Sequence, residues 1–181
     1  MTKEFVFGVN KTPFVVLGEN DDRIIAITKY GVMKAPIEVI VDGRVDEDYR
    51  DFLIDFKKNL LSLEGDSSKD GEKTKKDLKA LIKKVYLPSK ADIEKYLPNP
   101  KDRLCSAAPG ITAPVMAGKL TAEGNPACKW WTASTKDHSE WWKQEKSWKV
   151  TIDFDGNFGE SVSTYPDNLY RIVVEFKKEV I

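Results

Sequence analysis

The stretch Lys129-Trp130-Trp131-Thr132-Ala133-Ser134 opens the part of the chain that decides the fold. A charged insert follows it, then two strand patterns joined by Asp155-Gly156, and finally a closing strand pattern at 169–176. All five tryptophans of the 181-residue chain lie between positions 130 and 148. Because an indole ring is large, apolar and carries one N–H donor, this clustering indicates either a dense core or an aromatic recognition surface.

Three of the tryptophans are expected to serve packing. Trp130 and Trp131 are neighbours in a strand pattern, so their side chains should point to opposite faces of a sheet. Trp148 begins an alternating pattern that continues with two β-branched residues, and it is expected in the core.

The other two tryptophans have polar neighbours. Trp141 and Trp142 lie within residues 137–146, together with His138 and Lys143. Aromatic rings in a charged segment are typical of contact surfaces, so these four residues are the candidate ligand-binding residues. A ring folded back onto the core is the open alternative.

Outward from this region, the N-terminal part predicts hairpins and then a helix. Short aromatic or β-branched runs at 5–7, 14–17, 23–28 and 37–41 are separated by Gly, Pro, Asn and Asp, as in antiparallel sheets. From Val45 to Leu61 the apolar residues recur at helical spacing, which predicts an amphipathic helix.

The middle of the chain is more irregular. The polar run at about 66–76 predicts a mobile loop, and Leu78 to Val85 predicts a short helix whose last residues could instead form a strand. Ser89 to Asp92 matches a capping box that starts a further short helix. Residues 98–128 are rich in Pro and Gly and predict a long packed loop. This order of elements indicates a single α+β domain over residues 1–181.

Several short motifs resemble a known pattern. Val85 to Tyr96, then Arg103, the 130–134 strand, the segment 150–156 ending in Asp-Gly, and Tyr170 to Val174 follow one another as in a family of uncharacterised bacterial and phage domains. That family carries the signature Trp-Trp-Leu-Arg-Ser, then Asp-Gly, then Val-Arg-Pro-Ala-Leu. It is similar in turn to C-type-lectin-like and formylglycine-generating-enzyme-like folds.

The resemblance implies a C-type-lectin-like domain with antiparallel strands, one long helix and long irregular loops that display the binding surface. It also implies that the N- and C-terminal strands lie close together. Thr132 and Ala133 replace the Leu-Arg of the signature, so an ion pair made by that arginine is absent here. Ile172 and Val173 replace its Pro-Ala.

The composition restricts the partners. Lys plus Arg equals Asp plus Glu at 29 each, and this balance argues against duplex nucleic acid and anionic membrane as partners. No signal peptide or spanning apolar segment is recognised, so the expected location is cytoplasmic or associated with a phage particle. Two cysteines, Cys105 and Cys128, make no disulfide framework and are expected as free thiols.

No catalytic or metal site is recognised in the sequence. His138 has no nucleophile and orienting carboxylate arranged around it in a known motif. Asp153 to Glu160 lacks the spacing of a calcium loop and is more simply a hairpin turn. Neither cysteine matches the catalytic pair of formylglycine-generating enzymes. No cofactor is expected.

The sequence therefore favours a non-enzymatic binding module that recognises a protein partner through loop aromatics. Two alternatives stay open: a structural or assembly component of a phage particle, and an enzyme with an unrecognised site. The oligomeric state and the ligand are not encoded in any motif.

Overall fold

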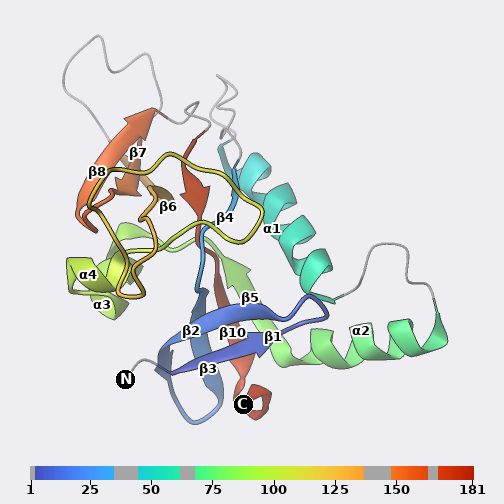
Figure 1. Ribbon diagram of the computed structural model, residues 1–181. Coiled ribbons are helices and arrows are strands. Elements are labelled where there is room, and N and C mark those ends of the chain that lie inside the picture. The colour runs from blue at the N-terminus through green and yellow to red at the C-terminus, as the bar shows by residue number, and fades with distance from the viewer. Residues whose placement is uncertain (1–2, 35–44, 62–67, 137–147, 163–166) are drawn as a thin grey trace. The chain divides into compact units, whose positions relative to one another are not determined.

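A computed structural model describes residues 3–34, 45–61, 68–136, 148–162 and 167–181 (Figure 1). The chain divides into two compact units. Unit 1 contains residues 1–29, 49–86 and 172–181, and unit 2 contains residues 30–48 and 87–171. Each contains one five-stranded sheet, which makes the protein a mixed α+β structure.

The sheet of unit 1 has the order β1-β2-β3-β10-β5, and its neighbouring strands are all antiparallel. Its strands are β1 (Glu4–Phe7), β2 (Thr12–Glu19), β3 (Arg23–Thr28), β5 (Ile82–Tyr86) and β10 (Val173–Lys177). The predicted strands at 5–7, 14–17 and 23–28 are confirmed. The predicted strand at 37–41 lies outside the described residues.

Phenylalanine rings fill the core of unit 1. Phe176 on β10 contacts Phe5, Phe7 and Phe14, with ring centroids 4.7 to 5.5 Å apart and tilted or edge-on geometry. Such pairs add to the free energy gained by burying the rings. The contact between Phe5 and Phe176 also confirms that the first and last strands lie close together in one sheet.

Helix α1 (Val45–Leu61) forms where the apolar spacing predicts it. Its last turn packs tightly on the turn after β1, because the Val9 N–H donates to the Leu60 carbonyl at 3.0 Å. A Cβ added to Gly8, whose φ is +85°, would lie 2.5 Å from that same oxygen. This close approach requires glycine there.

Helix α2 (Lys69–Leu81) corrects the predicted loop at about 66–76. The Ser68 hydroxyl caps it by accepting a hydrogen bond from the Gly71 N–H at 3.0 Å. None of its residues is buried, so no apolar stripe marked its first part in the sequence. Residues 78–81 of the predicted 78–85 helix form its last turn. The chain then enters β5 directly at Ile82. The last residues of the predicted 78–85 helix therefore form a strand, which was the stated alternative.

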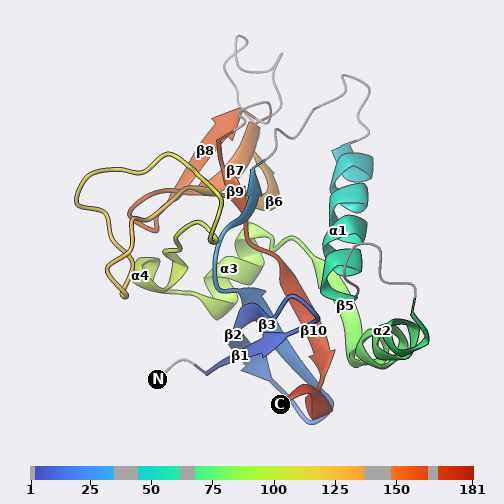
Figure 2. The ribbon, with the colours of Figure 1, turned by 45° about the vertical axis from the view of Figure 1, so that its right-hand side comes forward.

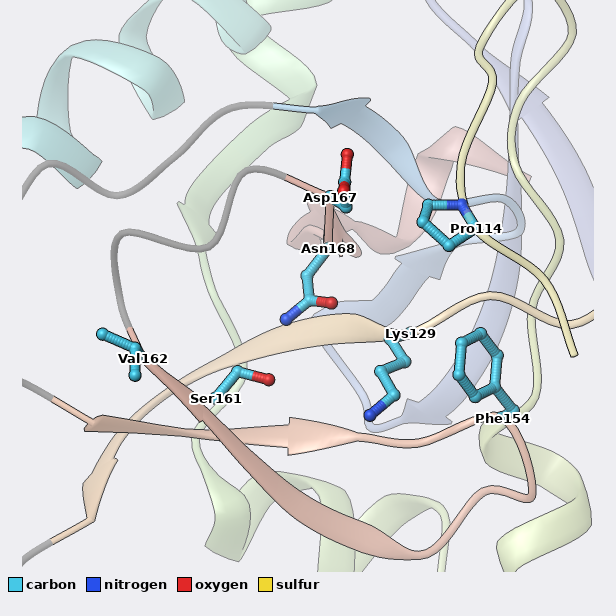
Figure 3. A pocket seen from close by; sticks show the side chains of 7 residues that line it. All are labelled: Pro114, Lys129, Phe154, Ser161, Val162, Asp167 and Asn168. Carbon is cyan, nitrogen blue, oxygen red and sulfur yellow. The ribbon is translucent and has the colours of Figure 1, made fainter.

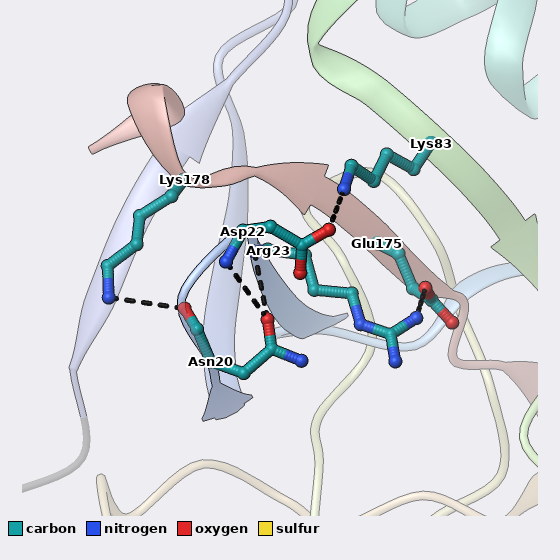
Figure 4. Close-up of polar contacts among 6 residues, drawn as sticks. All are labelled: Asn20, Asp22, Arg23, Lys83, Glu175 and Lys178. Carbon is teal, nitrogen blue, oxygen red and sulfur yellow. Dashed lines mark hydrogen bonds and ion pairs between the residues drawn. The ribbon is translucent and has the colours of Figure 1, made fainter.

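Residues at the β2–β3 turn of unit 1 bond to charged side chains of β5, of β10 and of the residue after β10 (Figure 4). Arg23 contacts Glu175 at 2.6 Å, Asp22 pairs with Lys83, and the Lys178 ammonium donates to the Asn20 carbonyl at 3.2 Å. The hydrogen bond from Lys83 holds the pKa of the Asp22 carboxyl below its usual range. These charges join β3, β5 and β10 at the surface, and we interpret them as structural.

The sheet of unit 2 has the order β4-β9-β6-β7-β8 (Figure 2). Its strands are β4 (Val32–Lys34), β6 (Trp130–Lys136), β7 (Trp148–Ile152), β8 (Phe158–Val162) and β9 (Leu169–Tyr170). Strands β6, β7 and β8 form an antiparallel meander, whereas β9 pairs with β6 in parallel. The predicted turn between β7 and β8 is confirmed, with Gly156 at φ +81°.

Two short helices precede the irregular segment of unit 2. Helix α3 (Lys90–Tyr96) begins at the predicted capping box, in which Ser89 and Asp92 bond reciprocally, and it buries Ile93. Helix α4 (Pro100–Arg103) follows. Residues 104–129 then run without a helix or a named strand, as the Pro and Gly content indicates.

Arg103 ties these helices to the β7–β8 turn. Its guanidinium donates hydrogen bonds to the carbonyls of Leu97 at 2.7 Å, Pro98 at 2.8 Å and Gly156 at 3.3 Å, and it lies 4.4 Å from the Phe158 ring centroid. All three bonds are charge-assisted and the residue is buried. Arg103 is therefore a structural clamp of unit 2.

The predicted final strand at 169–176 is wrong in one respect. The chain forms β9 and β10 there, separated by Arg171 and Ile172, and the two strands belong to the sheets of different units. Arg171 is buried with its guanidinium 5.4 Å from the Trp130 ring, while the Ile172 N–H donates to the Thr28 hydroxyl at 3.1 Å.

Among the described helices, none combines the length and the apolar composition of a membrane-spanning segment.

Candidate binding pocket of unit 2

The four predicted contact residues lie outside the described residues. His138, Trp141, Trp142 and Lys143 belong to residues 137–147, for which the structure gives no description. The strands on either side are described, and Lys136 at the end of β6 pairs with Trp148 at the start of β7. The role assigned to these four residues therefore stays a prediction.

The tryptophan pair of β6 is buried, as predicted. Trp130 and Trp131 both have no exposed surface. The Trp130 indole N–H donates to the Arg103 carbonyl at 3.0 Å, whereas the Trp131 indole nitrogen is buried without a partner. Trp148 is half-buried rather than fully enclosed. Trp130 and Trp131 thus serve packing.

The two faces of the unit 2 sheet carry different groups. The pairing of β6, β7 and β8 places Phe158 on the same face as Trp130, where Arg103 and Lys90 lie against the Phe158 ring. Helices α3 and α4 therefore cover this face. The opposite face carries Trp131.

A pocket of about 360 Å³ opens on the Trp131 face (Figure 3). Strands β6 and β9 are parallel, and Trp131 of β6 lies beside Tyr170 of β9. Lys129 comes two residues before Trp131, and Asn168 comes two residues before Tyr170. Side-chain alternation therefore directs Lys129 and Asn168 to this face. The pocket is lined by residues from four parts of unit 2, namely Pro114, Lys129, Phe154, Ser161, Val162, Asp167 and Asn168.

Polar groups converge at one end of this pocket. In Figure 3 the Asn168 amide points into the space between the Ser161 hydroxyl and the Lys129 ammonium. Asn168 is only 1% exposed, and its Nδ2 donor has no hydrogen-bond partner. A buried donor without an acceptor is costly and rare in folded proteins, so this one marks the pocket as a site where a ligand could supply the acceptor.

The charge of Lys129 is already compensated. Its ammonium lies 3.1 Å from an oxygen of Asp153 and 5.2 Å from the centroid of the Phe154 ring. The ion pair is partly exposed, so it contributes little to stability by itself. It does fix the ammonium at the pocket wall beside an aromatic surface.

A second hollow of about 430 Å³ lies where Tyr30 faces the irregular segment. Its walls come chiefly from small and apolar residues between Ser106 and Cys128. Nearby in the sequence, Val115, Met116 and Leu120 are about half exposed. The irregular segment thus presents apolar side chains as well as one wall of the first pocket.

Both cysteines are free and buried. The Cys128 N–H donates to the Cys105 carbonyl at 2.9 Å. Burial raises the pKa of the Cys105 thiol to about 11, although Arg171 opposes the shift, and burial also raises the pKa of Cys128. A thiol that keeps its proton at neutral pH is a poor nucleophile.

The raised pKa of Cys105 predicts a loss of stability at alkaline pH. Well below pH 9.0, the usual pKa of a thiol, the folded and unfolded chains both hold the proton, whereas between pH 9.0 and about 11 the unfolded chain loses it first. The free energy of unfolding should therefore fall over this range by about 2 to 3 kcal/mol. Urea unfolding at pH 8, 9, 10 and 11 measures it.

The control for this prediction is Cys105→Ala. Other groups titrate equally in the variant, so only the difference between the two pH profiles reports on Cys105. Profiles that run parallel from pH 8 to 11 would show that burial does not hold the thiol proton.

Among the described residues, no group of three His, Cys, Asp or Glu side chains is close enough to hold a metal ion.

The sequence pattern did not identify Lys129, Phe154, Ser161 and Asn168 as a site. The one signal available was a polar Asn directly before the apolar β9 strand.

Compared with protein-family models, curated proteins and solved structures, the chain has no match. The resemblance to the bacterial and phage domain family therefore stays a prediction that rests on its motifs.

Proposed function

We propose that this protein is a non-enzymatic binding module that recognises a protein partner with the Trp131 face of unit 2 and the segments around it. The observation that carries the proposal is the pocket on that face, in which a buried amide donor lacks an acceptor. The irregular segment contributes Pro114 to the same pocket and exposes apolar side chains beside it. Exposed apolar groups next to a concave site are typical of interaction surfaces.

The chemistry of the described residues favours binding over catalysis. The two thiols have raised pKa values, and the Lys129 ammonium is held in an ion pair. The pocket therefore offers hydrogen-bond donors and apolar walls.

The proposal includes a C-type-lectin-like arrangement in one domain over residues 1–181. It is supported by β1 and β10 belonging to one sheet, where Phe5 contacts Phe176. It is also supported by the β6–β7–β8 meander that follows a long irregular segment.

The proposal assigns the predicted contact residues to one end of this sheet. The segment that contains Trp141 and Trp142 begins and ends at the paired residues Lys136 and Trp148. Val162, which lines the pocket, pairs with that same Trp148. The segment therefore starts from the end of the sheet that Val162 occupies.

Replacing both Trp141 and Trp142 by alanine tests the proposal. We expect the melting temperature to change by about 3 °C or less, because a contact role requires both rings to be exposed and exposed side chains contribute little to stability. Capture of the partner, first identified by affinity purification from cell extract, should weaken at least about tenfold, as for aromatic hot spots.

Trp130→Phe is the matched control. It removes the indole donor to the Arg103 carbonyl and should lower the melting temperature while leaving partner affinity unchanged in the protein that remains folded. A large loss of stability in the Trp141/Trp142 variant, with no specific loss of capture, would place those rings in the core and contradict the proposal.

A further inference from the structure

We propose that the unit 2 pocket binds an apolar group that carries an uncharged carbonyl oxygen, with the Asn168 Nδ2 as the donor to that oxygen. The inference rests on the proposed binding function, since it names the chemistry that the partner would present. A peptide segment offers this chemistry where an apolar side chain adjoins a backbone amide, and a small amide offers it without any protein attached.

The first step concerns the Asn168 side-chain amide, whose nitrogen lacks a hydrogen-bond acceptor. Its side chain is almost wholly buried, lines the pocket and leaves Nδ2 without an acceptor. An amide nitrogen carries two N–H donors, so a ligand oxygen placed in the pocket would satisfy a group that the protein leaves unsatisfied. The Ser161 hydroxyl, which points toward the same space in Figure 3, can donate or accept beside it.

The second step is the apolar wall. Phe154 and Pro114 lie together on one side of the pocket in Figure 3. An aromatic ring and a proline ring gain most from contact with an apolar ligand group. The volume of about 360 Å³ suits one large side chain with an adjoining amide.

The third step is the charge, which decides between an amide and a carboxylate. Lys129 contributes a positive charge, but Asp153 lies 3.1 Å from its ammonium and cancels most of it. Asp167 adds a negative charge at the rim, although its carboxylate points away from Lys129 and Ser161 in Figure 3. The residues that line the pocket, taken together with Asp153, therefore offer donors without a net positive charge. A buried carboxylate without a compensating cation is unfavourable, so the neutral carbonyl is preferred.

A matched pair of probes tests this chemistry. The probes are 3-phenylpropanamide and 3-phenylpropanoate, which share the ring and chain and differ only in the amide and the carboxylate. Titration of the ¹⁵N-labelled full chain, followed by ¹H–¹⁵N NMR, should give saturable shifts of the Asn168 side-chain N–H₂ signals with the amide. We expect binding of the carboxylate to be at least tenfold weaker.

Asn168→Leu tests the donor itself. Leucine has nearly the same size and no N–H, so amide binding should weaken at least tenfold. The control is the same change at the exposed Asn59 of α1, in unit 1, which should leave amide binding unchanged. Should Asn168→Leu fail to fold, the shift of the Asn168 side-chain signals in the unaltered protein still decides the question.

Three outcomes would overturn the inference. They are equal or tighter binding of the carboxylate, unchanged amide binding by folded Asn168→Leu, and no shift of the Asn168 signals at millimolar amide. If any of these occurs while partner capture still depends on Trp141 and Trp142, only the pocket chemistry is wrong. If the amide binds as expected but no captured protein competes with it, the inference holds and the proposed function fails.

Discussion

Replacing Arg103 by methionine is expected to lower the free energy of unfolding of unit 2 by about 3 to 5 kcal/mol. The change removes three charge-assisted hydrogen bonds and leaves the carbonyls of Leu97, Pro98 and Gly156 without that donor. Each unmet buried acceptor carries its own cost, and the bonds share one guanidinium, so the losses do not simply add. Such a loss is a large part of the stability of a small domain.

Urea unfolding followed by tryptophan fluorescence measures this effect. All five tryptophans fall within the residues of unit 2, so the signal reports on that unit. Lys101→Met, on the same short helix and exposed, is the matched control and should change stability by about 0.5 kcal/mol or less. Equal losses in the two variants would show that Arg103 is not a clamp.

Replacing Gly156 by alanine is the second change with a large expected effect. Its φ of +81° disfavours any residue with a Cβ, which costs roughly 1 to 2 kcal/mol. The added Cβ would also lie 1.9 Å from the Pro100 carbonyl oxygen, which is backbone and cannot rotate away. We therefore expect a total loss above about 3 kcal/mol, because the β7–β8 turn must shift away from α4.

Gly124→Ala separates the two causes. Gly124 has a φ of +80°, almost the same as that of Gly156, but no atom lies within 4 Å of an added Cβ. Its loss should be only that of the backbone conformation, roughly 1 to 2 kcal/mol. If the two variants lose the same stability, the close approach between the turn and α4 is not present in solution.

Local patterns in the sequence predicted much of the fold. The helical spacing from Val45 to Leu61, the capping box at Ser89 and the Asp-Gly turn at Gly156 each specify a structure through neighbouring residues. These features act over one or two turns of chain. Interactions between neighbouring residues are therefore enough to predict these features.

The predictions failed where the local sequence pattern and the long-range pairing of strands indicate different structures. Residues 169–176 read as one continuous strand pattern, yet Leu169 pairs within one sheet and Val173 within another. Nothing in the run itself shows that Arg171 is buried beside Trp130. The first part of helix α2 was missed for the opposite reason, since the helix buries no residue and that part has only its Ser68 cap and first-turn acids to mark it.

The pocket could not be read from the sequence because its walls come from distant positions. Pro114 belongs to the irregular segment, Phe154 to a turn, and Asn168 to the residue before β9. Each has an ordinary structural interpretation alone. The pairing of β6 with β9 and of β7 with β8 brings Asn168 and Phe154 together, and the irregular segment adds Pro114.

The most direct test of the central claim is a ¹H–¹⁵N spectrum of the five indole N–H groups as the captured partner is added. We predict that the Trp141 and Trp142 signals shift or broaden on binding. The Trp130 signal should stay in place, because its N–H is held by the Arg103 carbonyl at 3.0 Å inside the unit. Unchanged Trp141 and Trp142 signals at saturating partner would contradict the account.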